Sequence, residues 1–92
     1  MRVVIVYKDN SEYTRSVYDF LRDYEARTGK QLETINPDTR EGSDFCRLYD
    51  IVEYPSIVAI TNSGSLQHIW RGLPLPLINE ESYYDKSRYQ RQ

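Results

Sequence analysis

An unbroken apolar run, Val3-Val4-Ile5-Val6, lies near the start of the chain within residues 2–7. A strand with one face in solvent alternates apolar and polar residues, whereas a strand covered by helices on both faces shows a continuous apolar run. Residues 2–7 are therefore predicted to form the central strand of a sheet that has helices on both sides.

The apolar spacing becomes helical after this strand. Large apolar side chains recur at intervals of three and four residues, which places them on one stripe that faces the sheet. Asp9, with Glu12 three residues later, predicts a capping box at the start of this helix, and Gly29 predicts its end. The stripe consists of Tyr13, Val17, Phe20, Leu21 and Tyr24.

A weaker strand is expected over residues 31–36, which carry only Leu32 and Ile35 as large aliphatic side chains. The order strand, helix, strand implies a parallel partner for the first strand, reached through the helix as a crossover. We therefore place residues 31–36 at an edge of the sheet, with Pro37 ending the strand.

A second, short helix is predicted before Tyr54-Pro55. Asp38 and Glu41 repeat the capping-box spacing. The helix should end before Tyr54, because the residue that precedes a proline is disfavoured in the helical conformation. The side chains at helical spacing, which are expected to face the core, are Phe45, Leu48, Tyr49 and Val52.

The last predicted strands form a hairpin. Residues 55–60 and 65–70 are strand-like runs, and Asn62-Ser63-Gly64 between them is a turn sequence. Two such runs around a turn predict antiparallel pairing.

The end of the chain predicts one more helix. Beyond Gly72, Asn79 is a candidate helix cap, with acidic residues in the first turn and basic residues late, as the helix dipole favours. The apolar face of this helix is thin and consists mainly of Tyr83 and Tyr84. Residues 85–92 are expected to be a frayed tail.

Length and composition fit one folded domain. The chain has 92 residues, of which 39% are hydrophobic, and nine of them are tyrosines. A chain of this size supports one hydrophobic core but not two. We expect a single domain over residues 1–92, with an ordered core from about residue 2 to about residue 84.

Charge and the absence of long apolar runs exclude several classes of partner. The net charge is −2, and the 14 acidic and 12 basic residues are interspersed, so neither nucleic acid nor a membrane surface is an expected partner. No run of about 18 apolar residues is present, and the first residues are too short for a signal peptide. The single cysteine, Cys46, permits no internal disulfide and fits a reducing compartment. We therefore expect a cytoplasmic location.

The order of these elements, with Tyr54-Pro55 at the entrance to the third strand, resembles the thioredoxin-like family over nearly the whole chain. The resemblance implies an α/β fold of the order β-α-β-α-β-β-α, with a four-stranded mixed sheet flanked by helices. Where the Cys-x-x-Cys motif of the family opens the first helix, this chain has Ser11-Glu12-Tyr13-Thr14. The resemblance also implies that Tyr54-Pro55 is a cis peptide beside that turn, where backbone groups pair with an extended peptide or with glutathione.

Ser11 and Thr14 take the positions of the two thiols in this comparison. A hydroxyl has a pKa far above 7 and needs a positioned base to become a nucleophile. The only histidine, His68, falls on the last predicted strand. Capping and solvent contact are therefore the expected roles of both hydroxyls.

No cofactor or metal site is expected. Cys46 lies inside the second predicted helix, next to core positions, where a lone cysteine is usually a small buried apolar group. One histidine and one cysteine do not make a metal-ligand set of recognisable spacing.

The leading hypothesis is a redox-inactive thioredoxin-like domain that binds a protein or an extended peptide, with glutathione as a less expected ligand. The expected binding residues are Ser11, Glu12, Tyr13, Thr14, Tyr54 and Pro55. One alternative is a monothiol, glutaredoxin-like redox enzyme that uses Cys46. Another is a structural homodimer that pairs exposed edge strands, since only Gln67 and Arg71 protect the last strand. The expected state is a monomer or a weak homodimer.

Overall fold

The computed structural model describes residues 2–76. The elements in this range are β1 (Arg2–Val6), α1 (Thr14–Thr28), β2 (Glu33–Ile35), α2 (Arg40–Tyr49), β3 (Ser56–Ile60) and β4 (Leu66–Arg71). None of the helices in this range is long and apolar enough to cross a membrane. The predicted third helix, with Tyr83 and Tyr84, and the predicted tail over 85–92 lie outside the described residues.

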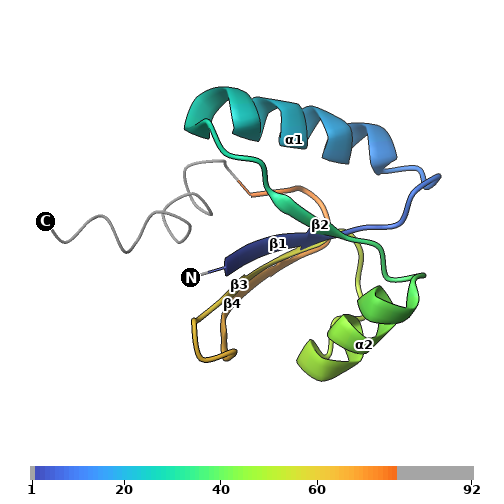
Figure 1. Ribbon diagram of the computed structural model, residues 1–92. Helices are drawn as coiled ribbons and strands as arrows, with labels where there is room; N and C mark the ends of the chain where they lie inside the picture. The colour runs from blue at the N-terminus through green and yellow to red at the C-terminus, as the bar shows by residue number, and fades with distance from the viewer. Residues whose placement is uncertain (1, 77–92) are drawn as a thin grey trace, which may run out of the picture.

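The strands form one mixed sheet in the order β2-β1-β3-β4. β1 runs parallel to β2 and antiparallel to β3, and β3 runs antiparallel to β4. In Figure 1, α1 covers one face of this sheet and α2 covers the other. The α/β class, the interior position of the first strand, the edge position of β2 and the antiparallel hairpin are all confirmed.

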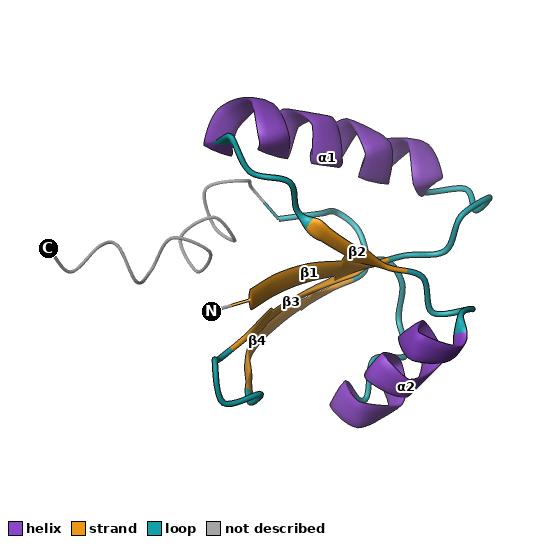
Figure 2. Cartoon of the chain, viewed as in Figure 1, coloured by secondary structure: helices purple, strands orange, loops and turns teal. Residues whose placement is uncertain are grey.

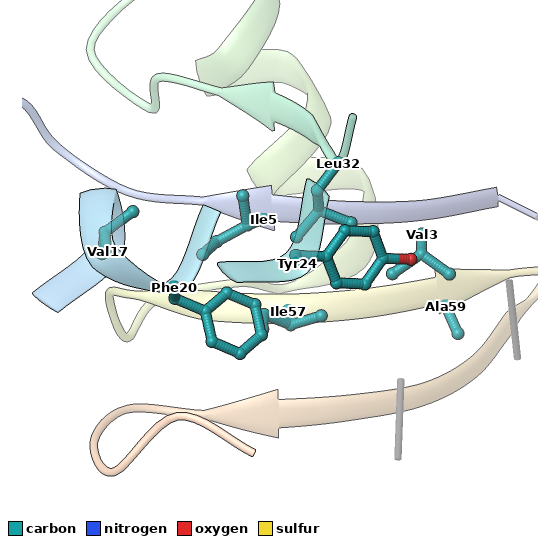
Figure 3. Packing of buried hydrophobic residues seen from close by; sticks show 8 residues of the cluster. All are labelled: Val3, Ile5, Val17, Phe20, Tyr24, Leu32, Ile57 and Ala59. Carbon is teal, nitrogen blue, oxygen red and sulfur yellow. The ribbon is translucent and has the colours of Figure 1, made fainter. Parts of the chain in front are cut away.

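The two inner strands separate two apolar clusters. Alternate residues of β1 point to opposite faces, so Val3 and Ile5 pack beneath α1 while Val4 and Val6 pack beneath α2. The cluster on the α1 side surrounds Tyr24 and is shown in Figure 3. The last four residues of β1 and all five of β3 are buried, which explains the continuous apolar runs over residues 3–6 and 57–60.

The start of α1 differs from the capping box predicted at Asp9 and Glu12. The helix begins at Thr14, and its N-cap residue, Tyr13, makes no side-chain capping bond. Asp9 instead accepts a 3.5 Å hydrogen bond from the hydroxyl of Tyr18. The chain makes a separate turn between β1 and α1. Asp9 and Glu12 therefore both lie before the first residue of the helix. Gly29 ends α1 as predicted, with a φ of 73° in the left-handed region.

The cap and the buried face of α2 also differ from the prediction. The N-cap is Thr39, whose side chain accepts a hydrogen bond from the Gly42 N–H, so Asp38 and Glu41 do not form a capping box. Leu48 and Val52 are 73% and 78% exposed, so their assignment to the core was wrong.

The face of α2 that meets the sheet includes two of the four predicted core positions, Phe45 and Tyr49. Gly42 and Cys46 are buried there, and Phe45 and Tyr49 are partly buried beside them. A Cβ atom at Gly42 would overlap the backbone carbonyl of Asn36, so this helix face approaches the chain after β2 at backbone distance. Val52 falls beyond the helix, which ends where Asp50 adopts a left-handed φ of 57°.

A β-bulge changes the expected alternation along β4. His68 lies opposite Ala59, but the register then shifts so that Leu66 lies opposite Ile60. Ala59 and Ile60 belong to clusters on opposite faces of the sheet. Leu66 therefore does not share one face with His68 and Trp70, as simple alternation predicts.

Candidate functional site

The loop after β1 and the bend before β3 meet at one end of the sheet. Val6 pairs with Ser56 in the antiparallel register, so the residues that follow Val6 lie next to the residues that precede Ser56. Figure 2 shows both loops at this end, between α1 and α2. The pairing of β1 with β3 therefore brings the Ser11–Thr14 turn close to Tyr54 and Pro55.

Lys8 connects the two halves of this region. Its backbone N–H donates a 2.8 Å hydrogen bond to the hydroxyl oxygen of Tyr13. Its ammonium lies 5.4 Å from the centre of the Tyr54 ring, in cation–π range, and 3.8 Å from the carboxylate of Asp38. Lys8 therefore contacts both tyrosines that the sequence proposed as binding residues, Tyr13 through its backbone and Tyr54 through its charge.

The hydroxyls of Ser11 and Thr14 are bonded to each other and to the loop. Their oxygens are 3.1 Å apart, and the backbone N–H of Ser11 donates to the Thr14 oxygen at 2.9 Å. Both hydroxyls also lie within hydrogen-bond distance of the Lys8 carbonyl, at 3.1 and 3.3 Å. These bonds order the turn. Because none of the partners is a base, they do not activate either hydroxyl as a nucleophile.

Glu12 occupies the outer side of this turn. It is exposed, and within residues 2–76 its carboxylate takes part in no ion pair. It brings a negative charge to the exposed part of this turn.

Pro55 is buried and is fixed from the opposite side of the bend. Its carbonyl accepts a 2.8 Å hydrogen bond from the N–H of Gly72, which follows β4. The peptide bond between Tyr54 and Pro55 is cis, as is that between Leu73 and Pro74. The Tyr54 hydroxyl donates to the carbonyl of Ile51 at 3.3 Å, and this bond fixes the hydroxyl end of the side chain.

Cys46 lies behind Tyr54 and is only 6% exposed. Burial raises the pKa of its thiol, and a hydrogen bond with Tyr54 opposes this effect only in part. Burial likewise raises the pKa of Tyr54, and the adjacent thiol adds to that rise. A buried thiol with a raised pKa forms little thiolate at neutral pH, so it is a poor nucleophile.

His68 lies outside the site. It belongs to β4, where its ring contacts that of Trp70 in a tilted arrangement, with 4.4 Å between centroids. Among residues 2–76, no group of three or more histidine, cysteine or acidic side chains could hold a metal ion.

The six residues proposed from sequence as a binding surface lie at this end of the sheet, and three further residues join them through the contacts above. Ser11, Tyr13, Thr14, Tyr54 and Pro55 line the site and Glu12 lies at its rim. Lys8, Asp38 and Gly72 were not identified, because their roles depend on contacts between distant segments. For Lys8 alone the sequence offered a signal, namely its position two residues after the end of β1.

Comparisons with known proteins support the fold. No protein-family model and no curated protein sequence matched the chain. Among solved structures, thioredoxin 1 from the thermophilic eubacterium Thermosipho africanus TCF52B is similar with a TM-score of 0.63 and 9% identity, covering 98% of this chain and 96% of that one. A malarial protein gives a TM-score of 0.63 with 12% identity over 92% of each chain. A designed protein gives 0.60 with 19% identity, over 99% of this chain and 78% of its own.

These similarities, together with the mixed four-stranded sheet, define a thioredoxin-like fold. Identities this low establish the arrangement of the chain and not its chemistry. The chemistry has to be argued from the side chains at the site.

Proposed function

We propose that this chain is a redox-inactive thioredoxin-like domain that binds an extended peptide segment of a partner protein. The surface would be formed by the Ser11–Thr14 turn and the Tyr54-Pro55 bend. The observation that carries the proposal is that two hydroxyls, 3.1 Å apart, occupy the start of α1 where the resemblance places two thiols.

The absence of a reactive thiol at this surface supports the redox-inactive part. The only cysteine is buried behind Tyr54, and burial raises its pKa. A monothiol mechanism needs an exposed, acidic thiol. The position of Cys46 therefore favours binding over catalysis.

The composition of the surface supports the binding part. Tyr13 and Tyr54 are partly buried rings with fixed hydroxyls, and Lys8 lies between them. Tyrosines held in one conformation supply contact area with little loss of side-chain entropy, and they are enriched at binding hot spots. The mixed charges of Lys8 and Glu12 would help to orient a polar peptide backbone.

The test is selection of peptides from a random heptapeptide display library on the purified domain, followed by affinity measurement against variants. Tyr54→Ala should lower the affinity for the selected peptides about tenfold or more, as expected for a hot-spot aromatic residue. Leu48→Ala, which removes an exposed apolar side chain on α2 outside the proposed surface, is the control and should leave affinity unchanged. Peptides that bind the wild type and Tyr54→Ala equally would contradict the proposed surface.

A second measurement tests the redox-inactive part. The purified protein is assayed for turnover of a glutathione mixed disulfide, alongside Cys46→Ser. No turnover by either protein is expected. Turnover that disappears in Cys46→Ser would replace the binding module with a monothiol enzyme.

A further inference from the structure

In the part of the chain that the structure describes, the outer edge of β2 carries backbone groups that no neighbouring strand satisfies. The Tyr7 N–H donates to the carbonyl of Ile35, which places Ile35 and, by the parallel pattern, Glu33 in bonds to β1. Thr34 alternates with them, so its N–H and carbonyl point away from β1. Thr34 is exposed, and β2 is the terminal strand of the sheet.

Hollows flank this edge on both faces of the sheet. On the α2 side, a cavity of about 340 Å³ lies between β2 and the start of α2, with Phe45 and Ile35 in its wall. On the α1 side, a cavity of about 280 Å³ is lined by Leu21 and Leu32. A third hollow of about 90 Å³ lies near the end of β2, and Thr34 lines all three.

This arrangement matches the geometry of an added strand. Successive side chains of an extended peptide point to opposite faces, so a strand bonded to Thr34 would direct alternate side chains into the two larger cavities. Unpaired edge backbone with receptive surface on both faces is the condition for strand addition.

The charges around the edge favour a basic peptide. Acidic side chains line the hollows on both faces: Glu33, Glu41, Glu25 and Asp9. Arg2 is the one basic side chain in these linings, and it already forms an ion pair with Glu33. Within residues 2–76, neither Glu25 nor Glu41 has an ion-pair partner. Each cavity also has an apolar wall, which suits the aliphatic stem of a lysine or arginine with its charged end at the acidic rim.

We propose that the free edge of β2 is a second docking site, which takes an extended, basic segment of a partner protein by strand addition at Thr34. This site lies on the opposite edge of β1 from β3 and Tyr54, so it does not depend on the peptide-binding surface proposed above. A basic strand would gain backbone bonds at Thr34 and charge pairing with Glu25 or Glu41.

The test uses a defined probe, the acetylated and amidated heptapeptide Lys-Val-Lys-Val-Lys-Val-Lys, titrated into ¹⁵N-labelled protein. Shift changes should centre on β2, and the Thr34 amide should exchange with solvent at least tenfold more slowly in the complex. A Glu-for-Lys peptide should bind at least fivefold more weakly. A version N-methylated at two adjacent central positions, which blocks both edges of the peptide, should also bind at least fivefold more weakly.

Variants separate this site from its alternatives. Glu25→Gln and Glu41→Gln should each lower the affinity for the lysine peptide about two- to threefold, as expected for exposed charge pairs. Asp23→Asn, on the exposed side of α1, and Tyr54→Ala should leave its affinity unchanged. These variants keep the backbone of β2 intact.

Four results would overturn the proposal. They are equal affinity for the lysine and glutamate peptides, equal affinity for the N-methylated peptide, shift changes centred on β4, and protection of Thr34 that rises with protein concentration without peptide. The last result would assign the edge to a second copy of this chain.

Discussion

The backbone N–H of Lys8 donates a 2.8 Å hydrogen bond to the hydroxyl oxygen of Tyr13, five residues further along the chain. This bond joins the start of the loop between β1 and α1 to its end. Because it is partly buried, water replaces it poorly if the hydroxyl is removed. The Tyr13 oxygen thus adds one bond to those of Ser11 and Thr14 that order the turn.

Tyr13→Phe should lower the free energy of unfolding by about 1 kcal/mol, since it leaves the Lys8 N–H without an acceptor. The measurement is a urea titration followed by circular dichroism. Tyr18→Phe is the control, because it loses only an exposed 3.5 Å bond to Asp9 and should change stability by less than about 0.5 kcal/mol. Equal effects of the two substitutions would mean that the loop bond contributes nothing specific.

Thr39→Ala should destabilise the protein by about 1 kcal/mol, the usual effect of losing an N-cap side chain. The Thr39 oxygen accepts from the Gly42 N–H at 3.0 Å and its hydroxyl donates to the Asn36 carbonyl at 2.8 Å. Asp38→Ala removes the residue that the sequence suggested as the cap and should have the smaller effect, because the Asp38 side chain makes a long ion pair with Lys8 and its backbone bond to Asn36 is kept. Urea midpoints of the two variants decide between the two caps, and a larger loss in Asp38→Ala would reject the Thr39 cap.

Gly42→Ala should destabilise the fold by about 2 kcal/mol or more, since overpacking at a backbone contact forces the helix to move. The added Cβ atom would overlap the Asn36 carbonyl. Ser43→Ala, one residue along the same helix, should change stability by less than about 0.5 kcal/mol. Thermal unfolding of both variants provides the comparison, and a neutral Gly42→Ala would show that α2 does not approach β2 so closely.

Stability should fall as the pH rises above about 8.5, where an unperturbed cysteine ionises. Burial raises the pKa of Cys46, so the folded protein keeps a proton that the unfolded chain has released. The stabilising contribution is complete below the unfolded pKa and is lost as the pH rises through the folded pKa. Tyr7 and Tyr54 shift in the same direction and extend the loss above about pH 10.

Urea unfolding of the wild type and Cys46→Ala at pH 7.5 and 9.5 measures this effect. The wild type should lose more stability between the two pH values than Cys46→Ala does. A thiol-modifying reagent should also react with native Cys46 more slowly than with the protein in urea. Rapid labelling of the native protein would contradict the burial of the thiol.

The strands were predictable because their signals are local and strong. Val3-Val4-Ile5-Val6 and Ile57-Val58-Ala59-Ile60 of β3 are apolar without interruption, as is typical of a strand buried on both faces. The hairpin followed from the turn at Asn62-Ser63-Gly64. The bulge between Ala59 and Ile60 has no comparable sequence signal, so the face of Leu66 was not predictable.

The second helix shows where local patterns fail. The sequence predicted one stripe through Phe45, Leu48, Tyr49 and Val52, whereas the stripe that meets the sheet runs through Gly42, Phe45, Cys46 and Tyr49. The close approach of Gly42 to the Asn36 carbonyl selects the second stripe, and this is a tertiary contact that spacing alone does not contain. The same limitation explains why Lys8 was missed, because its position above Tyr54 depends on the pairing of β1 with β3.

The sheet keeps its two apolar clusters apart, and this has a consequence for local opening. Cys46, Ile51 and Val58 pack only on the α2 side, while Tyr24 and Ile57 pack only on the α1 side. Each layer can therefore detach as a separate cooperative unit without exposing the other. Amide exchange should be slowest in β1 and β3, which both layers protect, so transient exposure of Cys46 to reagents would report on the α2 unit alone.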